Sequence, residues 1–376
     1  MRLWIRKHSN DAKLTAEESY YVATQWQLMW RRLRKHKLAL AGIAVLGFAY
    51  GSALFAEFIS TEDIYKRYVS YMYCPAQPIH IVHDGQLQWR PFVYGINTMR
   101  DPVTFERHYF EDRTVQYPVR FLVDSEPYEM WGLFTLKTRL FGVDKPGVFF
   151  PFGTDNLGRD IYSRTLHAGR ISLSIGFIGV ALSFVLGCVL GGISGYYGGT
   201  IDTLIQRVIE FFLSIPTIPL WMALAAAVPA QWPPLRTYLA ITIILSVIGW
   251  CGLARVVRGR LISLREEDYI LAARVAGASD ASIIRRHLLP AFLSYLIVNL
   301  TLAVPGMILG ETALSFLGLG LRAPVVSWGV LLADAQDVKV VALYPWLLIP
   351  GFFVILIVLA FNFLGDGLRD AADPYR

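Results

Sequence analysis

Long apolar runs separated by shorter polar segments dominate the chain. Several of these runs approach the roughly 20 residues that a helix needs to cross a bilayer. Because unpaired backbone groups are costly in lipid, runs of this kind must be helical. The pattern predicts six spans with these approximate bounds: 38–59, 171–193, 207–228, 237–257, 291–315 and 346–364.

The predicted fold is therefore an all-α polytopic membrane protein. Basic residues cluster before the first span, between Arg31 and Lys37, and again in the loop 258–290. Lys and Arg concentrate in cytoplasmic segments, so residues 1–37 and this loop are predicted to be cytoplasmic. Six crossings return the C-terminus to the same side. The stretch 153–376 then forms a core that carries the last five spans.

Residues 60–152 differ in composition from the rest and contain no run that could span a bilayer. They are rich in Tyr, Phe, Pro and mixed charge. We expect an enlarged external domain between the first two spans, packed on the mouth of the membrane part. The alternation over 115–123 predicts some strand. Its scattered histidines lack metal-ligand spacing, so no metal site is predicted.

Overall composition narrows the classes of function further. The chain is 55% hydrophobic and 17% charged, with a formal net charge of +6. Its basic residues follow the spans and no base-reading module is present, which excludes nucleic acid as a partner. No GxxxxGK[ST] or strand-linked GxGxxG motif occurs, so ATP is expected on a partner. No nucleophile and base pair can be recognised, and we predict no catalytic residue.

The loop 258–290 contains two predicted helical pieces. Asp268 is expected to cap the first, and Gly277 to end it in a left-handed conformation. Ser279 or Asp280 then caps the second piece, before Pro290 starts the next span. Such a loop either docks into another protein or lies as an amphipathic helix on lipid. The small residues of the first helix favour docking.

Charged residues near the spans give three further expectations. Glu311 faces the translocation cavity or is an interfacial carboxylate, and the sequence leaves both open. Arg207 and Glu210 are three residues apart on one helix face and are expected to pair. Asp155, Arg159 and Asp160 are expected to tie an outer turn ahead of the second span.

The loop resembles the EAA loop of ABC-importer permeases. Leu271-Ala272-Ala273 stands where that family has Glu-Ala-Ala, followed by Gly277 and by His287-Leu288-Leu289-Pro290. Leu271 replaces the glutamate and His287 an isoleucine, a form similar to the peptide/nickel permease subfamily. The resemblance implies an ATPase-coupling role for seven residues: Leu271, Ala272, Ala273, Arg274, Gly277, Ala278 and Ser279.

Four other segments carry the same resemblance, in order along 153–376. They are similar to the GTDxxGRD segment, the YYGGxxD turn, the outer loop and the tail of the subfamily. In this chain they are Gly153–Asp160, Gly195–Asp202, Ser315–Gly320 with Ser327–Gly329, and Gly365–Asp370 with Asp373-Pro374. The resemblance does not clearly extend over 61–150.

The resemblance implies a type I importer permease of the bacterial inner membrane, of the second or C-type. It would work by alternating access with a homologous second permease, two cytoplasmic ATPases that bind ATP and Mg²⁺, and an external solute-binding protein. Peptides are the implied substrates, and oligosaccharides, opines or nickel chelates remain alternatives. From another class, an ion-coupled secondary transporter or channel would need broken helices at repeat-related places, and no internal repeat is visible. A membrane hydrolase is a third, more distant reading.

Overall fold

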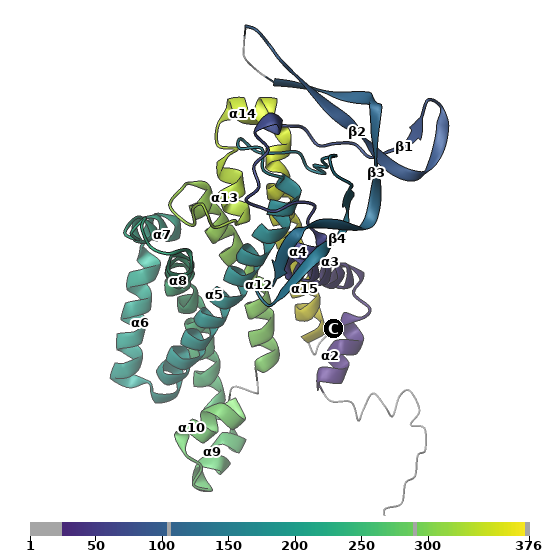
Figure 1. The fold of residues 1–376 in the computed structure, drawn as a ribbon. Coiled ribbons are helices and arrows are strands. Elements are labelled where there is room, and N and C mark those ends of the chain that lie inside the picture. The colour runs from purple at the N-terminus through teal and green to yellow at the C-terminus, as the bar shows by residue number, and fades with distance from the viewer. Residues whose placement is uncertain (1–24, 104–106, 289–291, 373–376) are drawn as a thin grey trace, which may run out of the picture.

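The protein is described here by a computed structural model over residues 25–103, 107–288 and 292–372. Long helices form a bundle with a β-sheet at one end and the short helices α9 and α10 projecting at the other (Figure 1). Most of the N-terminal segment, Pro290 and the tail residues Asp373-Pro374 lie outside the described residues.

Within the described residues, five helical stretches are long and apolar enough to cross a membrane, and a bent helix pair is a sixth candidate. The five are α3 (Lys37–Leu54), α5 (Ile161–Tyr197), α8 (Pro234–Leu264), α12 (Leu293–Phe316) and η3 (Pro345–Leu348) with α15 (Ile349–Ala372). Shorter helices complete the helical part: α2 (Gln25–Leu33), α4 (Ala56–Ile59), η1 (Val69–Tyr71), α13 (Trp328–Ala333) and α14 (Val338–Leu343). A polytopic helical protein is confirmed.

The predicted span over 207–228 is not one continuous helix. The chain forms α6 (Gly199–Ser214) and α7 (Thr217–Ala226), whose axes are bent by 86° at the break between them. Pro216 lacks an N–H group and disfavours helical backbone in the preceding residue. Ile215 accordingly adopts extended angles, φ −93° and ψ 129°. The bend follows from this dipeptide.

Close packing between α5 and α8 forms the centre of the bundle. Gly187, Gly191 and Gly195 recur every fourth residue of α5 and face α8. A Cβ at Gly191 would lie 2.5 Å from the carbonyl oxygen of Ala254, and one at Gly195 2.7 Å from that of Arg258. These glycines let the two backbones approach, as small residues do between membrane helices.

The segment between α4 and α5 contains a four-stranded antiparallel sheet in the order β1-β2-β3-β4. Its strands are β1 (His80–His83), β2 (Gln86–Arg100), β3 (Arg107–Met130) and β4 (Phe134–Val143). The first half of the long strand β3 pairs with β2, for example Phe92 with Pro118, and its second half pairs with β4. Strand structure over 115–123 is thus confirmed.

The N-terminal helix and the end of the last helix lie together. α2 packs on α15 through Met29, Leu33 and Ala371, which are buried in one cluster. The ring of His36 lies 3.9 Å from the carboxylate of Asp370. Figure 1 shows α2 and the end of α15 toward the end of the bundle where α9 and α10 project. Both ends of the described chain therefore share one side of the bundle.

Candidate coupling loop and the polar junctions of the bundle

The first short helix of the loop, α9 (Asp268–Val275), begins one residue earlier than predicted. The carbonyl of Glu267 accepts the first helical hydrogen bonds, from the N–H groups of Ile270 and Leu271. Glu267 is therefore the capping position, and the prediction that Asp268 caps this helix is wrong. Asp268 instead lies in the first turn, where a carboxylate is favoured by the helix dipole.

Gly277 ends α9 as the sequence predicts. Its φ of +83° lies in the left-handed region, which costs glycine little. The N–H of Gly277 donates to the carbonyl of Arg274, and the N–H of Ala278 to that of Ala273. This pair of bonds is the Schellman motif, which fixes the direction of the chain after a helix. The loop therefore has a defined elbow at Gly277.

Buried side chains fasten the loop to the bundle. Ile270 of α9, Ile283 of α10 (Asp280–Ile283) and Leu288 of the following π-helical turn η2 (Ile284–Leu288) are fully buried. They share one cluster with residues of α8 and α12, including Leu261 and Leu296. Two short helices would not be stable alone. Packing on α8 and α12 therefore stabilises the two short helices and fixes the loop to these long helices.

Tyr196, at the end of α5, holds the same loop by polar contacts. Its hydroxyl donates to Oδ1 of Asp280 at 2.5 Å and accepts from Nη2 of Arg274 at 3.3 Å. The guanidinium of Arg274 also lies 5.7 Å from the centre of the Tyr196 ring. Next to it, Asp202 pairs through both oxygens with Arg258 of α8, each at 2.5 Å. The turn after α5 thus braces the loop, a link that sequence spacing did not reveal.

The seven residues predicted to couple to an ATPase do not all face outward. Ala273 and Ala278 are half-buried and pack into the loop's own cluster. Ser279 occupies the capping position of α10, and its side chain makes no capping hydrogen bond. The remaining four, Leu271, Ala272, Arg274 and Gly277, are exposed. The small-residue face is therefore divided between inward and outward contacts.

Val275, which was not among the predicted coupling residues, forms an exposed apolar pair with Leu271 on this surface. Leu271 is 45% exposed, and Val275, one helical turn further on, is 90% exposed. Side chains four residues apart share a helix face. The helical spacing of these apolar residues was visible in the sequence. The sequence did not show which face of α9 is buried. Leu271, Ala272 and Val275 together form the outward face of α9.

Glu311 differs from both of its expectations, because its side chain is neither interfacial nor on an exposed wall. It is 0% exposed. Its carboxylate accepts hydrogen bonds from Ser315 at 2.8 Å, Ser327 at 2.7 Å and Ser172 at 3.1 Å. These serines belong to α12, to the cap of α13 and to α5. A buried carboxylate needs such donors, and here they join three elements.

The turn predicted over 153–160 is confirmed. Asp155 is 1% exposed and accepts from the backbone N–H groups of Leu157 and Arg159 and from Nε of Arg159 at 2.7 Å. Arg164 of α5 also donates to Asp155. Asp160 caps α5 by accepting from the N–H groups of Tyr162 and Ser163. This cap explains why α5 starts ten residues before the predicted span.

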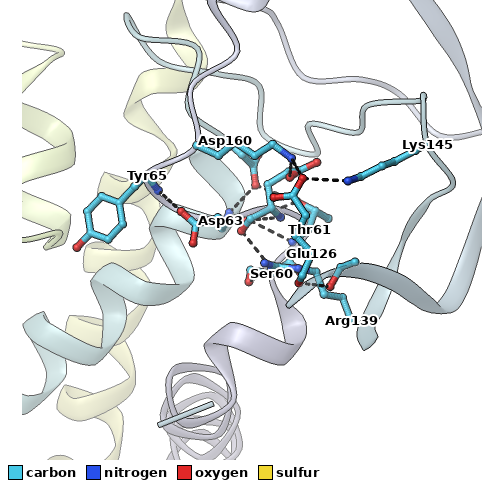
Figure 2. Close-up of polar contacts among 12 residues, drawn as sticks. Ser60, Thr61, Asp63, Tyr65, Glu126, Arg139, Lys145 and Asp160 are labelled. Atoms are coloured by element: carbon cyan, nitrogen blue, oxygen red, sulfur yellow. Dashed lines mark hydrogen bonds and ion pairs between the residues drawn. The ribbon is translucent and has the colours of Figure 1, made fainter. Parts of the chain in front are cut away.

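A polar junction joins this turn to the sheet (Figure 2). Thr61, just after α4, donates to Oδ2 of Asp160 at 2.9 Å. Arg139 of β4 is 6% exposed and donates to the carbonyl of Ser60 at 3.0 Å and to its hydroxyl at 2.6 Å. Burial raises the pKa of Asp160 to about 6. The root of the β3–β4 hairpin is therefore clamped to the start of α5.

A cavity of about 280 Å³ opens beside this junction. At its rim, Glu126 of β3 lies between Lys66 and Lys145, at 3.0 and 2.9 Å. Hydrogen bonds from Lys145 and Lys66 lower the pKa of Glu126 to about 2. Glu126 and Lys145 are exposed, so the contribution of their ion pair to stability is small. Nothing in the motifs pointed to these contacts, whose partners are far apart in the chain.

Two protein-family models match this chain. The family model described as "Binding-protein-dependent transport system inner membrane component" matches residues 146–375. The model for the N-terminal transmembrane domain of oligopeptide transport permease C matches residues 24–78. The first match covers more than half of the chain and includes the loop, the outer turn and Glu311. The chain belongs to this family.

Curated relatives agree with the assignment to the binding-protein-dependent inner membrane components. The dipeptide transport system permease protein DppC of Bacillus subtilis is 32% identical over 345 residues, which are 92% of this chain and 84% of the relative. The oligopeptide transport system permease protein OppC of Haemophilus influenzae is 44% identical over 224 residues, 59% and 70% of the two chains. The solved inward-facing MetNI methionine ABC transporter aligns at a TM-score of 0.40 and 20% identity, covering 54% of this chain and 93% of that one.

The two family models leave an internal segment of this inner membrane component unmatched. Residues 79–145 lie between the matched segments 24–78 and 146–375. This gap contains all four strands of the sheet. The sheet therefore lies outside the segments that the two family models match.

Proposed function

We propose that the chain is the permease subunit of an ATP-driven importer for peptides or solutes of similar size. The peptide assignment is supported by relatives described as dipeptide and oligopeptide permeases. In this proposal the chain pairs with a homologous second permease, and an external solute-binding protein delivers the substrate. Two cytoplasmic ATPases bind ATP and Mg²⁺, since the chain carries no nucleotide-binding motif.

The observation that carries the coupling role is the outward face of α9. Leu271, Ala272 and Val275 present apolar surface on a loop that is itself firmly packed on α8 and α12. A mobile loop could not transmit a push, and an exposed apolar surface on a fixed loop is typical of a protein-binding site. The ATPase is the occupant we assign to this face. Leu271 stands in place of the family's glutamate, so shape and apolar contact carry the docking.

In the proposed mechanism, closure of the ATPases on ATP moves α9 and α10 as one piece. Buried Ile270, Ile283 and Leu288 transfer this movement to α8 and α12. The translocation path then opens outward to receive solute, and hydrolysis returns the inward-open state. The coupling requires that the docked ATPases bind the two states with different affinities. The N-terminus, the C-terminus and the loop are cytoplasmic in this scheme, and the sheet is external.

Cysteine cross-linking tests the docking directly. Treated with a short thiol-to-amine cross-linker, Val275→Cys is expected to be joined to the ATPase in the assembled transporter, because its side chain is 90% exposed on α9. Val338→Cys is the matched control, since Val338 is 81% exposed but belongs to α14. In Figure 1, α14 lies at the opposite end of the bundle from α9.

The expected result is an ATPase adduct with Val275→Cys and none with Val338→Cys. An assembled complex that contains the ATPase but gives no adduct at position 275 would contradict the docking site. A chain that purifies as a transport-competent protein without any ATPase would instead support the ion-coupled transporter.

A further inference from the structure

The tip of the β3–β4 hairpin carries large apolar side chains that the protein leaves uncovered. Leu133 is 74% exposed, Phe134 58% and Trp131 42%. The run 131–136 reads Trp-Gly-Leu-Phe-Thr-Leu and contains no charged residue. Trp131 and Gly132 both have positive φ, 55° and 69°, which closes the turn tightly. A soluble surface seldom gathers such residues without a partner.

This tip lies against the end of α3, a predicted membrane span. Nε1 of Trp131 donates to the carbonyl of Leu54, the last residue of α3, at 2.7 Å. The rings of Trp131 and Phe55 are 5.7 Å apart. The root of the hairpin is fixed by Arg139 on Ser60 (Figure 2), and Figure 1 shows β4 beside α4 and α3. The hairpin therefore returns from the sheet to the level of the span's end.

The exposed apolar surface of the tip continues along α3 itself. Phe48 is 76% exposed, Leu54 51% and Phe55 40%. Phe48 lies on α3, and Phe55 is the residue that caps the C-terminal end of this helix. Exposed apolar side chains thus continue from the tip onto the outer half of α3. Lipid is the occupant that such a face of a membrane span requires.

We propose that the hairpin tip 131–134 inserts into the lipid interface beside α3 and anchors the sheet to the membrane surface. Tryptophan and phenylalanine favour this depth, where an apolar ring and a polar edge are both accommodated. The proposal rests on α3 crossing the membrane, as in the proposed function. It gives residues 79–145, which neither family model covers, a physical relation to the bilayer.

Fluorescence quenching in the complete transporter tests this placement. The three native cysteines are first replaced, and single cysteines are then introduced by Leu133→Cys, Trp89→Cys or Phe48→Cys and labelled with bimane. Trp89 is the matched control, since it is 97% exposed on β2 of the same sheet. Phe48 reports whether α3 spans the bilayer. Each complex is reconstituted in vesicles and quenched by headgroup-level nitroxide lipid, deep nitroxide lipid or aqueous iodide.

The expected result is that headgroup-level nitroxide removes most of the fluorescence at position 133, while iodide does so at position 89. Position 48 is expected to respond to the deep nitroxide. If position 133 responds to iodide as position 89 does, while position 48 responds to lipid, the anchor is wrong and the span stands. If position 133 is shielded from iodide only after solute-binding protein is added, the surface belongs to that protein and the lipid proposal is overturned.

Discussion

At the scale of single residues, contacts between polar groups that are close in the sequence could be predicted. Contacts between polar groups that are distant in the sequence could not. Asp155, Arg159 and Asp160 fall within six residues, so their shared turn could be inferred from spacing. Arg139 and Ser60 are 79 residues apart, and only the fold brings them together. Glu311 has one serine partner four residues away, but Ser172 and Ser327 come from other elements.

The buried cap of α5 gives a pH prediction at this scale. The pKa of Asp160 is raised to about 6 by burial, so the folded protein favours the protonated carboxyl. The stability that the protonated Asp160 carboxyl contributes is fully present below its unfolded pKa of about 4. This stability is lost as the pH rises through about 6. We expect Asp160→Asn to remove this loss, because the amide oxygen can still accept from Ser163 and Thr61.

Thermal unfolding of the assembled complex across the pH range measures this effect. Relative to Asp160→Asn, the wild-type Tm is expected to fall between about pH 4 and pH 6 and to remain level above about pH 7. The shift corresponds to as much as about 3 kcal/mol. Asp160→Ala is the control for the cap itself and should be less stable than Asp160→Asn by about 1 kcal/mol at every pH. A Tm difference between wild type and Asn that does not vary with pH would refute the ionisation argument.

At the scale of elements, apolar periodicity located the helices but not their ends or their breaks. α5 extends well before its predicted start because Asp160 caps it. The break between α6 and α7 was encoded in Ile215-Pro216, a signal that a search for long apolar runs passes over. The two pieces of the loop were recognisable from Gly277 and Ser279. The burial of Ala273 and the exposure of Val275 depend on packing against α8 and α12.

The elbow at Gly277 gives a prediction for the element that we assign to coupling. Gly277→Pro should abolish transport-coupled ATP hydrolysis while leaving membrane insertion intact, because proline cannot adopt a φ of +83° and cannot donate to the carbonyl of Arg274. Gly277→Ala should have a smaller effect, since the space around it is open and only the backbone strain of about 1–2 kcal/mol applies.

Gly259 supplies the matched control for this measurement. It lies on α8 with nothing within 4 Å of the position of a Cβ, so Gly259→Ala should behave as wild type. The measurement is ATP hydrolysis by the reconstituted complex with and without loaded solute-binding protein. Wild-type stimulation in Gly277→Pro would remove the elbow from the coupling mechanism.

At the scale of the whole molecule, the membrane character and the transport family followed from sequence, but the form of the sheet did not. Composition separated 60–152 from the rest, and only the structure resolves it into a long strand β3 that pairs with β2 and then with β4. α2, the end of α15 and the loop lie toward one end, and the sheet lies at the other (Figure 1).

This polarity agrees with a transporter that receives solute on the sheet side and force on the loop side. The central claim is therefore that ATP hydrolysis on a partner drives solute through this chain. Because the alternative is coupling to an ion gradient, the energy source is the property that separates the two most sharply.

The most direct measurement is uptake of a labelled peptide into vesicles that contain this chain with its second permease, ATPases and solute-binding protein. The account predicts uptake that requires Mg²⁺ and hydrolysable ATP on the side of α9, requires the solute-binding protein on the side of the sheet, and persists when ion gradients are collapsed. Uptake that proceeds without ATP and stops when an ion gradient is collapsed would contradict it.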